Sequence, residues 1–111
     1  MPERVPSLEF TEAERVLIQK LCERGPDDPE TRQLLNFWTE QCEAEANEVN
    51  TPRANVEFNI KRAKLYRAAG LMVEAWDVLE SAREQAMNEQ EQDLYDEAVR
   101  IMDEIGLEAG Q

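Results

Sequence analysis

The side chains that could do chemistry in this 111-residue chain are mainly carboxylates, because Asp and Glu total 25 and histidine is absent. Without histidine, the chain cannot form a Ser-His-Asp triad, a Cys-His pair or a histidine-ligated metal site. Its acidic runs also lack the Asp-x-Asp-x-Asp-Gly spacing of a calcium-binding EF-hand loop. We therefore expect a protein that is not an enzyme and holds no cofactor or metal.

The basic side chains gather in one stretch of this acidic chain. Residues 51–72 carry four more positive than negative charges, although the whole chain has a net charge of −13. Helical spacing places Ile60, Lys64 and Arg67 on one face of this stretch. Such a face would suit an acidic segment of a partner. The candidate partner-binding residues are Glu57, Ile60, Lys61, Lys64 and Arg67.

The same cations have a second interpretation, in which they act only within the fold. Carboxylates of neighbouring helices would neutralise them and so reduce self-repulsion in the folded chain. Most charge runs in proteins are solvated or paired internally, so this alternative stays open. The carboxylates expected nearby are Glu43, Glu45, Glu48, Asp77 and Glu80.

Five helices are predicted to position these residues, because apolar side chains recur at steps of three and four. The first four should cover 11–24, 29–49, 52–69 and 72–87. A fifth should start after a cap at Asn88 and end at Gly106.

Local signals set most of the helix ends. Thr11 with Glu14 forms a capping box, and Asp28 and Thr51 are N-cap residues that a proline follows directly. Gly70 is a typical residue just beyond a helix. The connections are short, so successive helices should be antiparallel neighbours.

The predicted fold is therefore all-α, with about five antiparallel helices in a single domain over 11–106. A flexible arm at 1–10, from which Phe10 docks, should precede it, and a flexible tail at 107–111 should follow. The segment 52–69 is apolar on two sides, which predicts a central position.

Residues 56–89 resemble one tetratricopeptide repeat, a helix–turn–helix of 34 residues. The resemblance rests on small and large side chains placed around Gly70: Ala63, Tyr66, Ala75, Leu79 and Ala82. The chain departs from the family pattern at Asn59, Arg62 and Met87. The resemblance implies a tetratricopeptide-like hairpin over 52–88, closed by the C-terminal helix. It also implies that the face bearing Lys64 lines a concave groove and points at a partner.

Together these features predict a non-catalytic protein–protein interaction module. Its helical surface would meet a peptide, a partner protein or a second copy of the chain, which would form a homodimer. The alternative is an acidic inhibitor, chaperone or nucleic-acid mimic that binds a basic partner through its carboxylate faces. The acidic composition and the lack of a long apolar run predict no direct binding to nucleic acid or membrane. We interpret Cys22 and Cys42 as reduced, buried thiols, which favours a cytoplasmic location.

Overall fold

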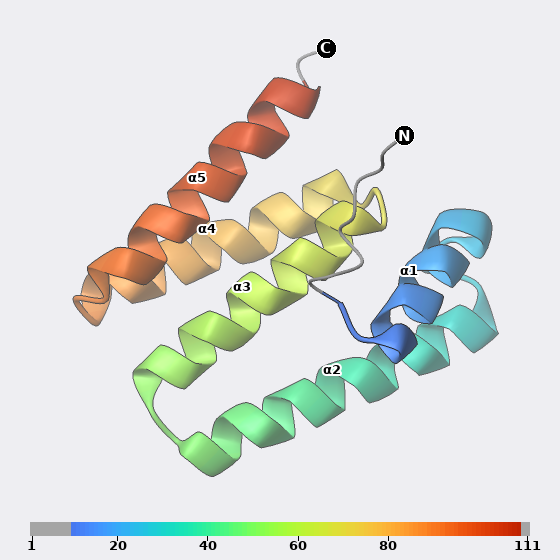
Figure 1. Cartoon of the computed structure of the whole chain (residues 1–111), viewed down its shortest axis with the longest axis horizontal. Helices are drawn as coiled ribbons and strands as arrows, with labels where there is room; N and C mark the ends of the chain where they lie inside the picture. The colour runs from blue at the N-terminus through green and yellow to red at the C-terminus, as the bar shows by residue number, and fades with distance from the viewer. Residues whose placement is uncertain (1–9, 110–111) are drawn as a thin grey trace.

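The computed structural model describes residues 10–109, which form five α-helices and no strand (Figure 1). These helices are α1 (Glu12–Arg24), α2 (Pro29–Val49), α3 (Pro52–Ala68), α4 (Met72–Asn88) and α5 (Gln92–Ala109). The predicted all-α fold is thus confirmed. Most of the predicted arm, residues 1–9, and the last two residues of the predicted tail lie outside the described residues.

The predicted N-terminal caps are confirmed at three helices. The Thr11 hydroxyl accepts a hydrogen bond from the Glu14 backbone N–H at 3.1 Å, and Glu14 Oε1 accepts one from the Thr11 N–H at 2.9 Å. Asp28 caps α2 through the Thr31 N–H, and Thr51 caps α3 through the Ala54 N–H. Each cap satisfies a backbone donor that has no partner inside its own helix.

The predicted start of the fifth helix is wrong. Asn88 is the last residue of α4 instead of the cap of α5. Gln90 adopts a left-handed φ of 62°, and the Glu91 N–H donates to the carbonyl oxygen of Ala86 at 2.9 Å. This bond is part of the Schellman arrangement that ends a helix, so α5 begins only at Gln92.

The predicted end of the fifth helix is also wrong, because α5 continues through Gly106 to Ala109. Gly106 lacks the positive φ that Gly70 adopts at 83° after α3. A glycine inside a helix costs only about 1 kcal/mol. The apolar stripe of α5, which includes the buried Ile105, holds this last part of the helix against the core.

Helix α3 contributes to two separate apolar clusters, as its two-sided pattern predicted. The first cluster joins α3 to α4 and α5, and its buried members include Val56, Ile60, Leu79, Ala98 and Ile101. The second joins α3 to α1 and α2, and its buried members are Leu17, Leu21, Leu35, Leu65 and Ala69. Phe10 and the half-buried Trp38 pack against the second cluster. Helix α3 therefore connects α1 and α2 to α4 and α5.

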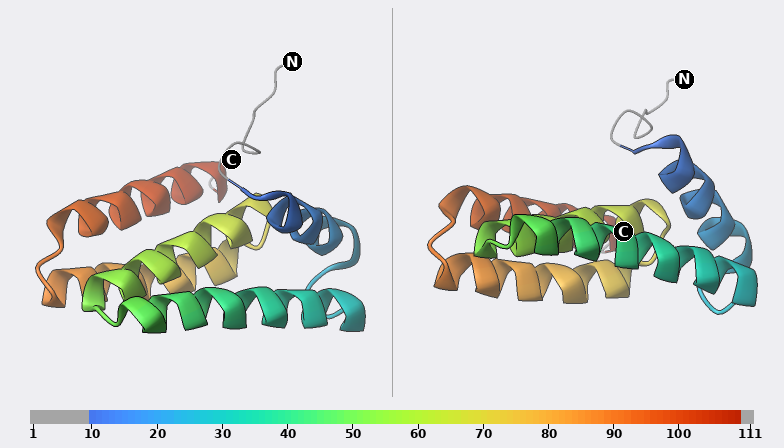
Figure 2. Two further views of the ribbon diagram at one scale, coloured as in Figure 1. Left: turned by 60° about the horizontal axis from the view of Figure 1, so that its bottom comes forward. Right: turned by 90° about the horizontal axis from the view of Figure 1, so that it is seen from below.

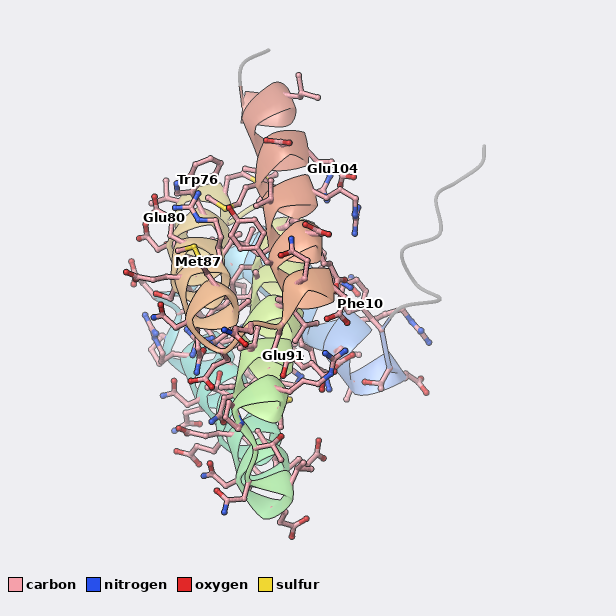
Figure 3. The ribbon with its side chains drawn as sticks, turned by 90° about the vertical axis from the view of Figure 1, so that its left-hand side faces the viewer. Phe10, Trp76, Glu80, Met87, Glu91 and Glu104 are labelled. Atoms are coloured by element: carbon pink, nitrogen blue, oxygen red, sulfur yellow. The ribbon has the colours of Figure 1, made fainter. Side chains whose placement is uncertain are left out.

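The helices lie in two layers. Helices α1 and α5 rise on either side of α3, whereas α2 and α4 lie on the opposite side of the molecule (Figure 2). Figure 3 shows Trp76, Glu80 and Met87 along α4, on the side away from Phe10. Side chains of α1, α3 and α5 line a hollow between α1 and α5.

Candidate functional site

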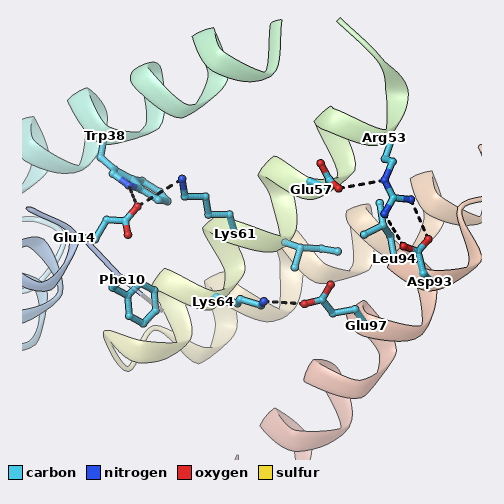
Figure 4. Close-up of a pocket in the computed structure, with 11 residues that line it drawn as sticks. Phe10, Glu14, Trp38, Arg53, Glu57, Lys61, Lys64, Asp93, Leu94 and Glu97 are labelled. Carbon is cyan, nitrogen blue, oxygen red and sulfur yellow. Dashed lines mark hydrogen bonds and ion pairs between the residues drawn. The ribbon is translucent and has the colours of Figure 1, made fainter. Parts of the chain in front are cut away.

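The hollow above α3 is a groove of about 570 Å³, which we call the central groove (Figure 4). Its floor is one face of α3, formed by Arg53, Glu57, Ile60, Lys61 and Lys64. Four of the five predicted contact residues therefore line a single groove. They share one face because their spacing of three and four residues matches the helical turn.

Arg67, the fifth predicted contact residue, lies outside the central groove. Its guanidinium donates a hydrogen bond of 2.6 Å to Glu104 on α5, and this bond lowers the pKa of the Glu104 carboxyl. Arg67 therefore connects α3 to α5 beyond the groove.

The walls of the central groove come from three other segments. Phe10 and Glu14 line it at the start of α1, and Trp38 lines it from α2. On the far side, α5 contributes Asp93, Leu94 and Glu97. None of these six residues was expected to be a contact residue. Two of them carried local signals, Phe10 as a docking residue and Glu14 as part of a capping box.

The cations of the groove are paired with carboxylates of the same chain. Lys64 Nζ lies 2.7 Å from Glu97 Oε2, and Lys61 Nζ lies 3.7 Å from Glu14 Oε2. Arg53 Nη2 lies 2.6 Å from Asp93 Oδ2 (Figure 4). The basic helix is therefore neutralised within the fold on its groove side.

Arg53 holds the largest network of the groove. Besides Asp93, its guanidinium contacts Glu91 at 2.7 Å and Glu57 at 3.2 Å. The hydrogen bonds to Asp93 and Glu91 raise the pKa of Arg53, and the bond from Arg53 lowers the pKa of Asp93. The network ties the start of α3 to the start of α5.

The carboxylates expected to neutralise α3 are not the ones that do so. Those named from the sequence lie on α2 and α4 and are all exposed: Glu43, Glu45, Glu48, Asp77 and Glu80. The carboxylates of other segments that pair with α3 instead lie in α1, in α5 and at Glu91, directly before α5. The reason is the layering, because Arg53, Lys61 and Lys64 line the groove between α1 and α5, while α2 and α4 lie on the opposite side of the molecule.

Glu14 connects three helices at one wall of the groove. It is only 5% exposed. In addition to its cap of α1, Glu14 Oε2 accepts a hydrogen bond of 2.9 Å from Trp38 Nε1 on α2. Burial by itself raises the pKa of Glu14, but the bonds from Trp38 and Thr11 and the charge of Lys61 outweigh it, so the pKa lies below its ordinary value. A buried carboxylate in this position is stable because it is both hydrogen-bonded and paired.

Arg62 differs from the other basic side chains of α3. Its guanidinium carbon lies 5.4 Å from the ring centroid of Phe58 and 5.9 Å from that of Tyr66. Its buried Nε has no hydrogen-bond partner among the described residues. Cation–π attraction therefore holds this cation, outside the central groove.

A second hollow, of about 460 Å³, lies between α1 and α2 and was missed by sequence analysis. Its lining is largely apolar and includes Val16, Leu34 and Phe37. Phe37 is 62% exposed. The sequence signal was the adjacent pair Phe37-Trp38, since successive side chains of a helix point about 100° apart.

The two cysteines are free and differ in their surroundings. Cys42 is buried, as predicted, and burial raises the pKa of its thiol. Cys22 is exposed, so the prediction of a buried thiol is wrong there. Its Sγ lies 3.6 Å from the carbonyl oxygen of Ala69, at the edge of the second apolar cluster.

Within residues 10–109, no three Cys, Asp or Glu side chains are arranged so that they could hold a metal ion. No helix in the same part of the chain is both long and apolar enough to cross a membrane. The central groove combines paired charges along its α3 floor with the apolar wall residues Phe10, Trp38 and Leu94. Comparisons with protein families, with curated proteins and with solved structures found no match to this chain.

Proposed function

We propose that this protein is a non-catalytic interaction module that binds another protein or a peptide in the central groove. The observation that carries the proposal is the gathering of α1, α2, α3 and α5 side chains around one groove of about 570 Å³. Its lining combines apolar side chains, such as Phe10 and Leu94, with polar groups that could orient a ligand. Recognition sites commonly combine these two kinds of lining.

A tetratricopeptide-like hairpin remains part of this proposal. Ala63, Ala75 and Ala82 are fully buried in the first cluster, so the backbones of α3 and α4 can approach closely. This packing agrees with a close helical hairpin, and it also occurs in many hairpins of other families. We also propose a cytoplasmic location, with which the free thiols of Cys22 and Cys42 agree.

Site-specific photo-crosslinking tests the proposed function. A benzoyl-phenylalanine in place of Phe10 puts the reactive group at the groove, with an aromatic ring where one already lies. The control carries the same group in place of Met87, which is exposed on the far side of the molecule (Figure 3). Both variants are irradiated in a lysate of the source cells and compared by mass spectrometry.

We expect a discrete protein adduct from position 10 that position 87 does not give. An excess of the unmodified chain should compete the adduct away, because a specific site saturates. Adducts that are the same from both positions, or that do not decrease on competition, would contradict a binding role for the groove.

A further inference from the structure

Two cations of the central groove, Arg53 and Lys64, are already bonded to carboxylates of the chain itself. Arg53 uses its Nε, Nη1 and Nη2 on Glu57, Glu91 and Asp93, and Lys64 pairs with Glu97 at 2.7 Å. An acidic ligand would have to compete with carboxylates that the fold holds at contact distance. The tethered carboxylates lose no translational freedom on pairing, whereas the ligand does. The paired cations therefore disfavour an acidic ligand.

The carboxylates of the groove keep capacity for a further ligand. Four carboxylates line it against three cations, and the negative side chains are Glu14, Glu57, Asp93 and Glu97. The Glu57 side chain is 52% exposed and that of Asp93 is 61% exposed. An ionised carboxylate can accept about four hydrogen bonds, more than these two receive from Arg53. The carboxylates of the floor and of the α5 wall therefore offer more hydrogen-bond acceptor sites than the cations of the groove occupy.

The net charge of the whole chain also favours a positively charged ligand over a negatively charged one. A net charge of −13 gives the protein a negative field, and a groove with low-dielectric walls focuses that field on a ligand. Steering by such a field accelerates the approach of cations and slows the approach of anions.

The apolar side chains of the groove suit the rest of such a ligand. Phe10, Trp38 and Leu94 come from three different segments and line the same space. The exposed part of the Trp38 ring could also contact a guanidinium by cation–π attraction. A peptide with apolar side chains near its charges would use both kinds of surface.

We propose that the partner segment is a basic peptide, in which Lys or Arg side chains meet Glu57 and Asp93 and a nearby apolar side chain meets Phe10 and Trp38. The inference rests on the proposed function and replaces the acidic partner expected from the sequence. The acidic partner followed from counting the cations of α3 without the carboxylates that α5 brings to them.

Selection from a display library of random twelve-residue peptides on the immobilised full chain tests the inference. At low salt, the retained peptides should be enriched in Lys and Arg and depleted in Asp and Glu relative to the unselected library. Synthetic copies with a fluorescent label then give dissociation constants by anisotropy. Binding should weaken as salt is raised, because exposed charge pairs are screened.

Two matched variants locate the binding. Glu57→Gln/Asp93→Asn removes two carboxylates of the groove, and Glu80→Gln/Glu84→Gln removes the same charge from exposed positions of α4. We expect the groove variant to weaken binding of a selected peptide about fivefold and the control by less than about twofold. Circular dichroism must first show equal helicity in all three proteins.

Three outcomes would overturn the inference. Selection of acidic peptides that the groove variant binds more tightly would show that the groove takes the opposite charge, although the proposed function would stand. Equal weakening by both variants would assign the binding to the general field of the protein. With no enrichment of any peptide the inference also fails, and the crosslink from position 10 then decides the proposed function separately.

Discussion

Replacement of Glu14 by alanine should destabilise the protein more than any other loss of a single carboxylate in α1. The substitution removes the acceptor of the Thr11 N–H, the acceptor of the Trp38 Nε1–H and the partner of Lys61. These contacts join α1 to α2 and α3. The variant therefore reports whether Glu14 connects the helices or only caps α1.

The magnitude follows from the groups that lose their partner. Loss of a helix cap costs about 1 kcal/mol. A donor such as Trp38 Nε1, left without its acceptor, costs about 1–3 kcal/mol, and the lower end applies because Trp38 is only half-buried. The pair with the exposed Lys61 adds at most about 1 kcal/mol. We expect a loss of about 2–3 kcal/mol.

Urea unfolding followed by circular dichroism at neutral pH measures this loss. Glu12→Ala is the control, because Glu12 also lies in the first turn of α1 but is exposed. It should cost less than about 1 kcal/mol, the usual effect of one charge at a helix terminus. If Glu14→Ala costs no more than Glu12→Ala, the bonds from Glu14 to α2 and α3 do not contribute as the geometry indicates.

The same position gives a dependence on pH with a defined sign. The folded state lowers the pKa of Glu14 from its ordinary value of 4.5, so its stabilising contribution is complete above that pH. The contribution is lost as the pH falls through the lower pKa of the folded state. The difference in unfolding free energy between the wild type and Glu14→Gln should therefore shrink on acidification below 4.5. If this difference stays constant on acidification below pH 4.5, the lowered pKa of Glu14 does not contribute to stability as stated.

The remaining predictions concern packing and turns, and urea unfolding measures each. Ala75→Leu should cost about 1–3 kcal/mol, because Ala75 is fully buried between α3 and α4. Gly70→Val should cost about 1–2 kcal/mol through strain at a φ of 83°. If neither variant lowers the free energy of unfolding, the predicted hairpin alignment is contradicted. Gln90→Gly should stabilise by about 0.5–1 kcal/mol, because glycine adopts a φ of 62° without strain. Phe37→Ser should change stability by no more than about 0.5 kcal/mol, since Phe37 is largely exposed; a larger loss would place it in the core.

The capping signals show how much of the fold was predictable. Thr11, Asp28 and Thr51 start α1, α2 and α3 where expected, because a cap acts on donors only three residues away. Gly106 was misleading because packing of the α5 stripe against the core keeps the helix continuous through it. Asn88 was misleading because α4 extends to it and ends in the Schellman arrangement that the left-handed Gln90 allows.

The candidate site was predictable in part for the same reason. The shared face of Glu57, Ile60, Lys61 and Lys64 follows from the helical repeat alone. Arg67 was expected with them but lies beyond the groove, bonded to Glu104. The residues opposite this face depend on how α1 and α5 are oriented against α3. No pattern of residues close together in the sequence determines that orientation.

The sequence by itself determined the elements of this protein: five helical stripes, three N-terminal caps and a cationic face on the central helix. These features arise from hydrogen bonds and side-chain contacts between residues three or four positions apart. Only the tertiary structure decided which charges meet. It brings Asp93 and Glu97 to Arg53 and Lys64 across more than thirty residues of chain, while Glu43 and Glu80 stay exposed. The physical reason is that ion pairs require contact distance, and contact between distant residues is set by the packing of whole helix faces.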